Sequence, residues 1–307
     1  MVFLGSGAFA IPSLEVLLDA GHQVLAVITQ PDKEKGRGRG LAPPPIKPVA
    51  ERRGVPVLQP RRIKEPEAQA ALRSLAPELQ VVVAYGQILP PSVIDIPPLG
   101  TVNVHASLLP RYRGAAPIQW AILNGETETG VTTMLIDPGL DTGPTLLARA
   151  TPIGLQETAA ELAPRLARLG AELLLETVEG LARGILTPTP QDHARASLAP
   201  LIRKQDGHLD WTQQADAIAR RVRAFQPWPG VTTACRGMAL KVLRATAAGM
   251  GAGMPGEIVG LDRDGIVVAC GQGTRLRLIE VQPESRNPMP ASAFAAGAHL
   301  AIGSRLD

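Results

Sequence analysis

The stretch TVNVHASLLPRYRG, residues 101–114, decides the fold. Its two valines, Val102 and Val104, alternate with Asn103 and His105 at the period of two that is typical of a β-strand. The valines therefore share one face, which we expect to be packed, and the amide and the imidazole share the other. The proline of the LLP segment has no N–H for a central strand, so the strand ends before it. The two polar side chains thus lie near a carboxyl end, where ligands bind in open α/β sheets.

Apolar segments before this stretch alternate with an amphipathic helix. We expect a strand at 2–4, a helix at 8–20 and a strand at 24–28, which together form a βαβ unit with a right-handed crossover. The nearly continuous apolar run 79–84 predicts a strand that is buried on both faces. These patterns predict an α/β domain of Rossmann-like type with a mostly parallel sheet.

The segments after the opening stretch predict an antiparallel addition to that sheet. Strands at 131–136 and 145–153 are separated by a short turn that leaves no room for a crossover helix, so they pair antiparallel. A long helix at 157–182 follows, and Pro164 is expected to kink or split it. We therefore assign residues 1–185 to the first domain.

A smaller β domain is predicted for the last third of the chain. Residues 186–200 are polar and rich in proline, as is typical of a linker. Residues 201–307 begin with a helix at 213–225, and short strands with turn signals follow it. The expected strands are 232–235, 239–245, 257–261, 266–269 and 275–281. Five short strands in this length predict a small barrel of the OB type.

Charge is unevenly distributed along the 307 residues, although the formal net charge is only +3. Residues 31–64 hold ten basic and three acidic side chains, a local net of +7, and residues 201–307 hold 13 and nine, a net of +4. Such concentrations favour a polyanionic partner, and a solvated basic face is the alternative. Because only 3% of the residues are aromatic, binding of RNA by base stacking on several aromatic platforms is not expected.

The cysteines and histidines do not form metal-binding or disulfide patterns. The two cysteines, Cys235 and Cys270, are far apart and outside any CxxC motif, which is typical of a reduced, cytoplasmic protein. The five histidines are scattered without ligand spacing, so no metal is expected. No apolar run is long enough for a membrane span, and no basic segment precedes an apolar one at the start, as a signal peptide would require. We expect a monomer.

The glycines near the start do not form a dinucleotide site. The third glycine of the GxGxxG pattern is missing, and Ile11 and Pro12 occupy that neighbourhood. The second strand ends in Thr29 and Gln30, so no acidic residue is placed to bind a ribose hydroxyl. NAD is therefore not expected.

A third polar residue changes the interpretation of the histidine. A lone histidine is more often structural, but Asn103 supplies a neutral donor on the same face as His105, as stabilisation of an oxyanion requires. Asp141, in a turn rich in glycine and proline, is within reach of the imidazole and would set its tautomer or charge. Ser107 lies in the turn and no GxSxG elbow is present, so direct attack on an acyl group is favoured over a covalent intermediate.

These residues stand in motifs with a family resemblance. The segments VNVHASLLPRYRGAAPIQWAI and GVTTMLIDPGLDTG resemble the core of the folate-dependent formyltransferases. FLGSGAFAIPSL, QPDKEKGRGRG and VVVAYGQILP extend the similarity to members that formylate methionyl-tRNA, and FQPWPG and NPMPASAF resemble their C-terminal domain. The similarity covers nearly the whole chain. One departure is Gly5-Ser6-Gly7, where the family commonly has Gly-Thr-Pro; others are Glu34 at a usual proline position and LIRK at 201–204.

The resemblance implies a substrate pair and a set of residues. The donor would be 10-formyltetrahydrofolate and the acceptor the α-amino group of methionine on initiator tRNA. Asn103, His105 and Asp141 would be the catalytic set. The folate would contact Tyr85, Gly86, Gln87, Ile88, Leu89, Ser107, Leu108, Leu109, Pro110 and Asp141. The tRNA would contact Lys33, Lys35, Arg37, Arg39, Lys204, Arg220, Arg221, Arg223 and Lys241.

Two alternatives stay open. Formyltransferases that act on a sugar-nucleotide amine share the same core and can share a barrel-like second domain. A folate-binding or RNA-binding protein without catalysis would also carry the fold, but it would be expected to have lost one of the three catalytic residues, and all three are present.

Overall fold

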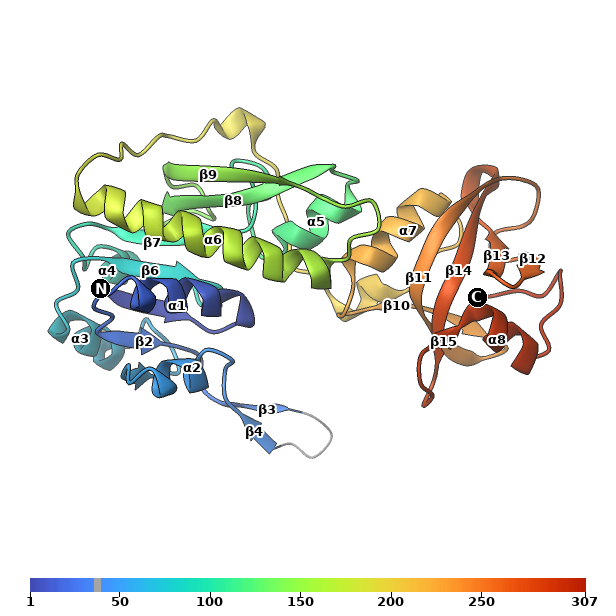
Figure 1. Cartoon of the computed structure of the whole chain (residues 1–307), viewed down its shortest axis with the longest axis horizontal. Helices are drawn as coiled ribbons and strands as arrows, with labels where there is room; N and C mark the ends of the chain where they lie inside the picture. Colours follow the sequence, from blue (N-terminus) through green and yellow to red (C-terminus); the bar gives the residue numbers. More distant parts are fainter. Residues whose placement is uncertain (36–39) are drawn as a thin grey trace. The chain divides into compact units, whose positions relative to one another are not determined.

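The computed structural model describes residues 1–35 and 40–307 and contains two compact units (Figure 1). The first unit comprises 1–117, 128–152 and 163–200, and the second comprises 118–127, 153–162 and 201–307. The segment predicted to be a linker, 186–200, thus packs with the first unit.

A seven-stranded sheet forms the centre of the first unit. In chain order its strands are β1 (Val2–Gly5), β2 (Ala26–Ile28), β5 (Val57–Leu58), β6 (Gln80–Val83), β7 (Thr101–His105), β8 (Glu128–Leu135) and β9 (Thr145–Pro152). Their spatial order is β5-β2-β1-β6-β7-β8-β9. The pairs from β5 to β7 are parallel, and β8 pairs antiparallel with both β7 and β9. The predicted mostly parallel sheet with an antiparallel addition is confirmed.

Helices alternate with these strands along the chain. They are η1 (Ala8–Ala10), α1 (Ile11–Asp19), α2 (Lys47–Arg52), α3 (Pro66–Ser74), α4 (Pro91–Ile94), α5 (Pro117–Leu123) and α6 (Ala159–Ala182). Figure 1 shows α6 lying along the sheet. A Cβ placed on Gly170 of α6 would lie 2.9 Å from the side chain of Val104, so glycine lets this helix approach β7 closely. Pro164 lies inside α6, which continues through it as one helix.

The sheet reverses its strand order between β1 and β6, and a serine joins the carboxyl ends there. The hydroxyl of Ser6 donates to the carbonyl oxygen of Tyr85 at 3.0 Å. The hydroxyl oxygen of Ser6 in turn accepts from the backbone N–H of Gln30 at 3.1 Å and from the hydroxyl of Thr29 at 3.2 Å. Ser6 therefore links the ends of β1, β2 and β6, at the switch point where α/β sheets bind ligands.

The basic segment after β2 contains two short strands that pair with each other. Strand β3 (Lys33–Lys35) pairs antiparallel with β4 (Gly40–Ala42). Just before β3, Asp32 accepts hydrogen bonds from Gln59 at 2.6 Å and from Lys47 at 3.2 Å. These two bonds, the one from Gln59 above all, hold the pKa of the Asp32 carboxyl below its usual value.

The second unit contains a six-stranded antiparallel sheet. Its strands are β10 (Val231–Cys235), β11 (Met238–Met250), β12 (Ile258–Asp262), β13 (Gly265–Ala269), β14 (Thr274–Pro283) and β15 (Met289–Pro290). The order is β10-β11-β14-β13-β12, with β15 paired to β14. Helices α7 (Ala215–Ala224) and α8 (Ala291–Gly297) pack against it, and short 3₁₀ turns lie at η3 (Lys204–Gly207) and η4 (Gly271–Gly273). A further 3₁₀ turn, η2 (His193–Arg195), belongs to the first unit. The predicted antiparallel β domain is confirmed.

Residues 303–307 join the two edges of this sheet. Leu306 bridges Cys235 at the end of β10, and Arg305 bridges Glu257 just before β12. The N–H of Leu306 donates to the carbonyl oxygen of Gly256 at 2.9 Å. Hydrogen bonding therefore continues from β12 through these residues to β10 and closes the sheet into a barrel.

Both cysteines lie in this barrel as free, buried thiols. Burial raises the pKa of Cys270 to about 12 and also raises that of Cys235. In the described part of the chain, no helix is long and apolar enough to cross a membrane.

Candidate active site

His105, at the carboxyl end of β7, is the buried centre of the candidate site. Its side chain is 6% exposed, and Nε2 lies 2.9 Å from the carbonyl oxygen of Tyr112. A carbonyl oxygen can only accept, so Nε2 carries a proton and Nδ1 is the nitrogen that gains or loses one. Nδ1 faces Asp141 at 3.7 Å from Oδ2. That separation suits an ion pair better than a direct hydrogen bond.

Asp141 is held by its own turn and by the loop after β7. Its Oδ2 accepts a hydrogen bond of 2.8 Å from the N–H of Gly114. The backbone of Asp141 has a φ of +50°, in the left-handed region that few side chains adopt. Asp137 shapes the turn, since its Oδ1 accepts from the N–H of Gly139 at 3.0 Å and from the hydroxyl of Thr142 at 2.6 Å. The carboxylate is therefore fixed opposite the imidazole.

Asn103 lies two residues before His105 and shares its face of β7. Its side chain is partly exposed, and Val104 faces the other way, against α6. In the sheet, Asn103 is paired with Val82 on one side and Met134 on the other. The expected division of the strand into a packed and a polar face is therefore present. Asn103 and His105 present an amide donor and an imidazole at the carboxyl edge of the sheet.

The loop after β6, predicted to contact the folate, divides into buried and outward-facing residues. The side chains of Tyr85 and Leu89 are 2% and 7% exposed and lie in the core, and burial raises the pKa of Tyr85 to about 12. The side-chain amide of Gln87 forms hydrogen bonds with the backbone of the loop after β5. Gly86 is exposed, and Ile88 is 93% exposed. This loop therefore offers a ligand its backbone and one apolar side chain.

The turn after β7 is fixed by its serine. Ser107 is fully buried, and its hydroxyl donates to the carbonyl oxygen of Arg111 at 2.6 Å. Its own carbonyl oxygen accepts from the hydroxyl of Thr132 at 2.7 Å. Ser107 thus shapes the turn with both groups, while Leu108 to Pro110 stay partly exposed.

The basic residues predicted to contact RNA lie in different surroundings. Three of them, on α7, donate to backbone carbonyl oxygens of the second unit: Arg220 to Leu123 at 3.0 Å, Arg221 to Asp206 at 3.1 Å and Arg223 to Glu157 at 3.0 Å. Burial lowers the pKa of Arg223. These three guanidinium groups therefore have structural contacts that the sequence did not predict.

The other residues predicted to contact RNA lie outside α7. Lys33 and Lys204 are exposed, and the end of the Lys241 side chain lies over Gly230. Lys35 lies on β3. Arg37 and Arg39 lie outside the described residues.

Two contacts of the site escaped sequence reasoning. The carbonyl of Tyr112 sets the His105 tautomer, and the N–H of Gly114 holds Asp141. Both are backbone groups, which every residue type carries. The only sequence signal is the glycine itself, whose φ of +122° favours a residue without Cβ.

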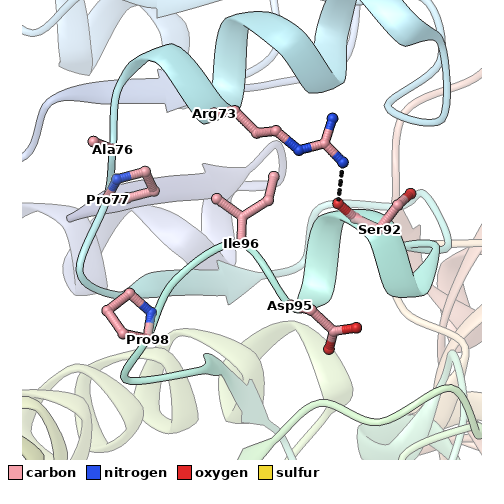
Figure 2. A pocket seen from close by; sticks show the side chains of 7 residues that line it. All are labelled: Arg73, Ala76, Pro77, Ser92, Asp95, Ile96 and Pro98. Atoms are coloured by element: carbon pink, nitrogen blue, oxygen red, sulfur yellow. Dashed lines mark hydrogen bonds between the residues drawn. The ribbon is translucent and has the colours of Figure 1, made fainter.

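A hollow of about 540 Å³ lies elsewhere, at the amino ends of β6 and β7 (Figure 2). Ile96 and two prolines line it, and Arg73 crosses its rim to donate to the carbonyl oxygen of Ser92 at 3.1 Å. This edge is opposite to the one that carries His105. Among the described residues, no group of three or more His, Cys, Asp or Glu side chains could hold a metal ion.

Comparison with known families places this chain in one enzyme class. Residues 1–178 match the family described as Formyl transferase, and residues 201–299 match Formyl transferase, C-terminal domain. The methionyl-tRNA formyltransferase of Citrifermentans bemidjiense is 52% identical over 306 residues, which cover all of this chain and 96% of that protein. The chain belongs to the methionyl-tRNA formyltransferase family.

Solved structures share the fold at low identity. An N-formyltransferase from Helicobacter canadensis, in complex with folinic acid and dTDP-3-aminofucose, superposes with a TM-score of 0.67 at 19% identity, over 92% of this chain and 98% of that one. HypX from Aquifex aeolicus, in complex with tetrahydrofolic acid, gives 0.65 at 18% identity over 98% of this chain. This chain spans about half of HypX, 47% of its length. At these identities the likeness concerns the fold alone.

Proposed function

We propose that this enzyme transfers a formyl group from 10-formyltetrahydrofolate to the α-amino group of methionyl-tRNA, for translation initiation, by direct attack through a tetrahedral intermediate. The observation that carries the proposal is the pairing of His105 with Asp141 on the face of β7 that Asn103 shares. An amide donor, an imidazole and a carboxylate are the groups that acyl transfer to an amine requires. The acceptor is an aminoacyl-tRNA, which assigns the reaction to the cytoplasm.

The three residues have separate roles in this reaction. Asn103 donates to the formyl oxygen as attack by the amine turns it into an oxyanion. His105 exchanges a proton at Nδ1, because Nε2 is bound to the Tyr112 carbonyl. Asp141 stabilises the imidazolium that forms. The net movement of the proton is from the attacking amine to the folate nitrogen that leaves. His105 and Asp141 pass this proton on.

The folate would lie along the outward side of the loop after β6 and the turn after β7. Gly86 and Gln87 offer backbone groups to a planar polar ring, and Ile88 offers an apolar side chain. The side chains of Tyr85, Leu89 and Ser107 are buried, so they support this surface from behind. Leu108 to Pro110 and Asp141 border it on the β7 side.

Replacement of Ile88 by alanine should raise the KM for the folate donor about tenfold, since loss of its apolar contact removes on the order of 1–2 kcal/mol. Thermal stability should not change, because the side chain is 93% exposed. The matched control is Leu155→Ala, another apolar side chain that is 88% exposed. Steady-state kinetics with varied donor would contradict the placement if both variants gave the KM of the parent enzyme.

The tRNA would contact both parts of the chain, with residues 1–185 as catalytic domain, 186–200 as linker and 201–307 as tRNA-binding domain. The proposed phosphate contacts are Lys33, Lys35, Arg37, Arg39, Lys204, Arg220, Arg221, Arg223 and Lys241. The exposed lysines are the most accessible of those described. The three α7 arginines would have to exchange a backbone carbonyl for a phosphate or bind it with their remaining N–H groups. We propose that the enzyme works as a monomer.

An acceptor assay tests the function directly. The protein is incubated with 10-formyltetrahydrofolate and either methionyl-initiator tRNA or an amino-sugar nucleotide, at about 50 and 200 mM salt. We expect formylmethionyl-tRNA only, with kcat/KM for tRNA falling steeply as salt rises and the donor KM nearly constant. Formylation of the sugar alone would assign the enzyme to the alternative class. Binding of the donor without transfer to either amine would favour a non-catalytic binding protein.

A further inference from the structure

We propose that Gln191 and Ser197 are positioning residues that set the geometry of the His105–Asp141 pair, so that the segment predicted as a linker completes the active site. The inference rests on the proposed function of that pair. Residues 189–199, named here the strap, contact the loop that follows His105 and the turn that carries Asp141, and they belong to the same compact unit.

Gln191 fixes the backbone of the Asp141 turn. Its side chain is 9% exposed, and Nε2 donates to the carbonyl oxygens of Asp141 at 2.9 Å and Gly143 at 2.7 Å. Its Oε1 accepts from the guanidinium of Arg113 at 2.6 and 3.1 Å. The amide cannot be reversed, because its NH₂ group would then face a guanidinium and its oxygen two carbonyls. One buried side chain thus connects the turn of Asp141 to the loop after β7.

Ser197 acts on the other member of the pair. Its hydroxyl accepts from the N–H of Tyr112 at 2.9 Å, and its carbonyl oxygen accepts from the N–H of Arg113 at 2.8 Å. Tyr112 has a φ of +61°, a strained conformation for an aromatic residue that its neighbours must maintain. In that conformation the Tyr112 carbonyl binds His105 Nε2. The strap therefore fixes the group that orients the imidazole.

A third contact reaches the Asp141 carboxylate. The N–H of Ala199 donates to the carbonyl oxygen of Arg113 at 2.7 Å. The next residue, Gly114, lies so close to the strap that a Cβ would be 2.7 Å from the carbonyl oxygen of Ala199. Gly114 is also the donor to Asp141 Oδ2. The strap therefore holds the groups that fix His105 and Asp141, whose Nδ1 and Oδ2 atoms are 3.7 Å apart.

Gln191→Glu isolates this role with almost no change of volume. The glutamate keeps an oxygen for Arg113 but places a second oxygen against two carbonyls, so the Asp141 turn should move. We expect kcat to fall on the order of 100-fold, the effect of a displacement of about 1 Å in a catalytic group, with the KM for methionyl-tRNA unchanged. The control is Gln69→Glu on α3, where the same change removes a donor to the Lys64 carbonyl on the surface.

A double-mutant cycle separates positioning from stability alone. In a His105→Ala background, Gln191→Glu should lower kcat no further, because the group it positions is gone. Ser197→Ala should follow the same pattern, and Ser197→Thr, which keeps the hydroxyl, should restore activity. An equal loss of kcat in both backgrounds would overturn the inference, and so would parent-like kcat in Gln191→Glu.

One readout does not depend on activity. The ¹⁵N resonances of the His105 ring report its tautomer and its neighbour, and we expect them to shift in Gln191→Glu but not in Gln69→Glu. Unchanged resonances would overturn the positioning role whatever the acceptor. Absence of transfer by the parent enzyme would instead overturn the proposed function, so the two failures are distinguishable.

Discussion

Replacing His105 with alanine is expected to lower kcat for formyl transfer by roughly 10²–10⁴-fold, the range for a positioned general acid or base. The imidazole is the group that exchanges a proton in the proposed reaction, and Nδ1 is the atom that does so, since Nε2 is committed to the Tyr112 carbonyl. Asn103 remains in the variant and still stabilises the oxyanion, so activity should not fall to the uncatalysed rate. The KM values for donor and tRNA should change little, because binding surfaces are untouched.

Two further variants make this result interpretable. His22→Ala removes a histidine at the amino edge of the same sheet, partly exposed, and should keep full activity. Asp141→Asn removes the carboxylate 3.7 Å from Nδ1. If the two groups act as a unit, the double variant should be about as slow as the slower single one, since effects within a catalytic unit do not add. Turnover near that of the parent in His105→Ala would exclude the proton-transfer role, and thermal unfolding of each variant would show whether folding contributes.

The sequence predicts strand β7 well because its information is local. The alternation of valines with Asn103 and His105 defines two faces, and the proline-bearing turn defines the end of the strand. Asp141 could be assigned to the same site as His105 because glycine and proline mark its turn. Turns that follow paired strands in this way lie at one edge of the sheet. The antiparallel pair β8 and β9 follows in the same way from the short connection between the two strands.

The remaining contacts could not be predicted, because they are backbone bonds between distant parts of the chain. Tyr112 and Gly114 act through a carbonyl and an N–H, which leave no trace in residue type. Gln191 stands in a polar segment rich in proline, which is the usual sign of a linker. Its side chain is nevertheless buried, and it bonds to Asp141, which is 50 residues away in the sequence. Composition also cannot distinguish an arginine that faces solvent from one, such as Arg223, that donates to a backbone carbonyl oxygen.

The closure of the second unit leads to a large expected effect on stability. Leu306 is fully buried and stands between β10 and the start of β12. Replacing it with alanine should lower the free energy of unfolding of this unit by about 2–5 kcal/mol, the usual cost of a buried leucine. Removing residues 304–307 should do more, because Ala234 and Ile258 would also lose the backbone bonds of 2.9 and 2.8 Å that they donate to this segment. An open sheet with two free edges would remain.

Amide hydrogen exchange resolves this effect within the chain. The amides of Ala234 and Ile258 should lose protection when residues 304–307 are removed, while those of β7 in the first unit should not. Ile302→Ala is the matched control, since that side chain is 67% exposed a few residues away. If the barrel holds tRNA, the KM for methionyl-tRNA should rise in the shortened protein and the KM for the donor should stay constant. Equal stability of Leu306→Ala and Ile302→Ala would show that the closing segment does not hold the barrel together.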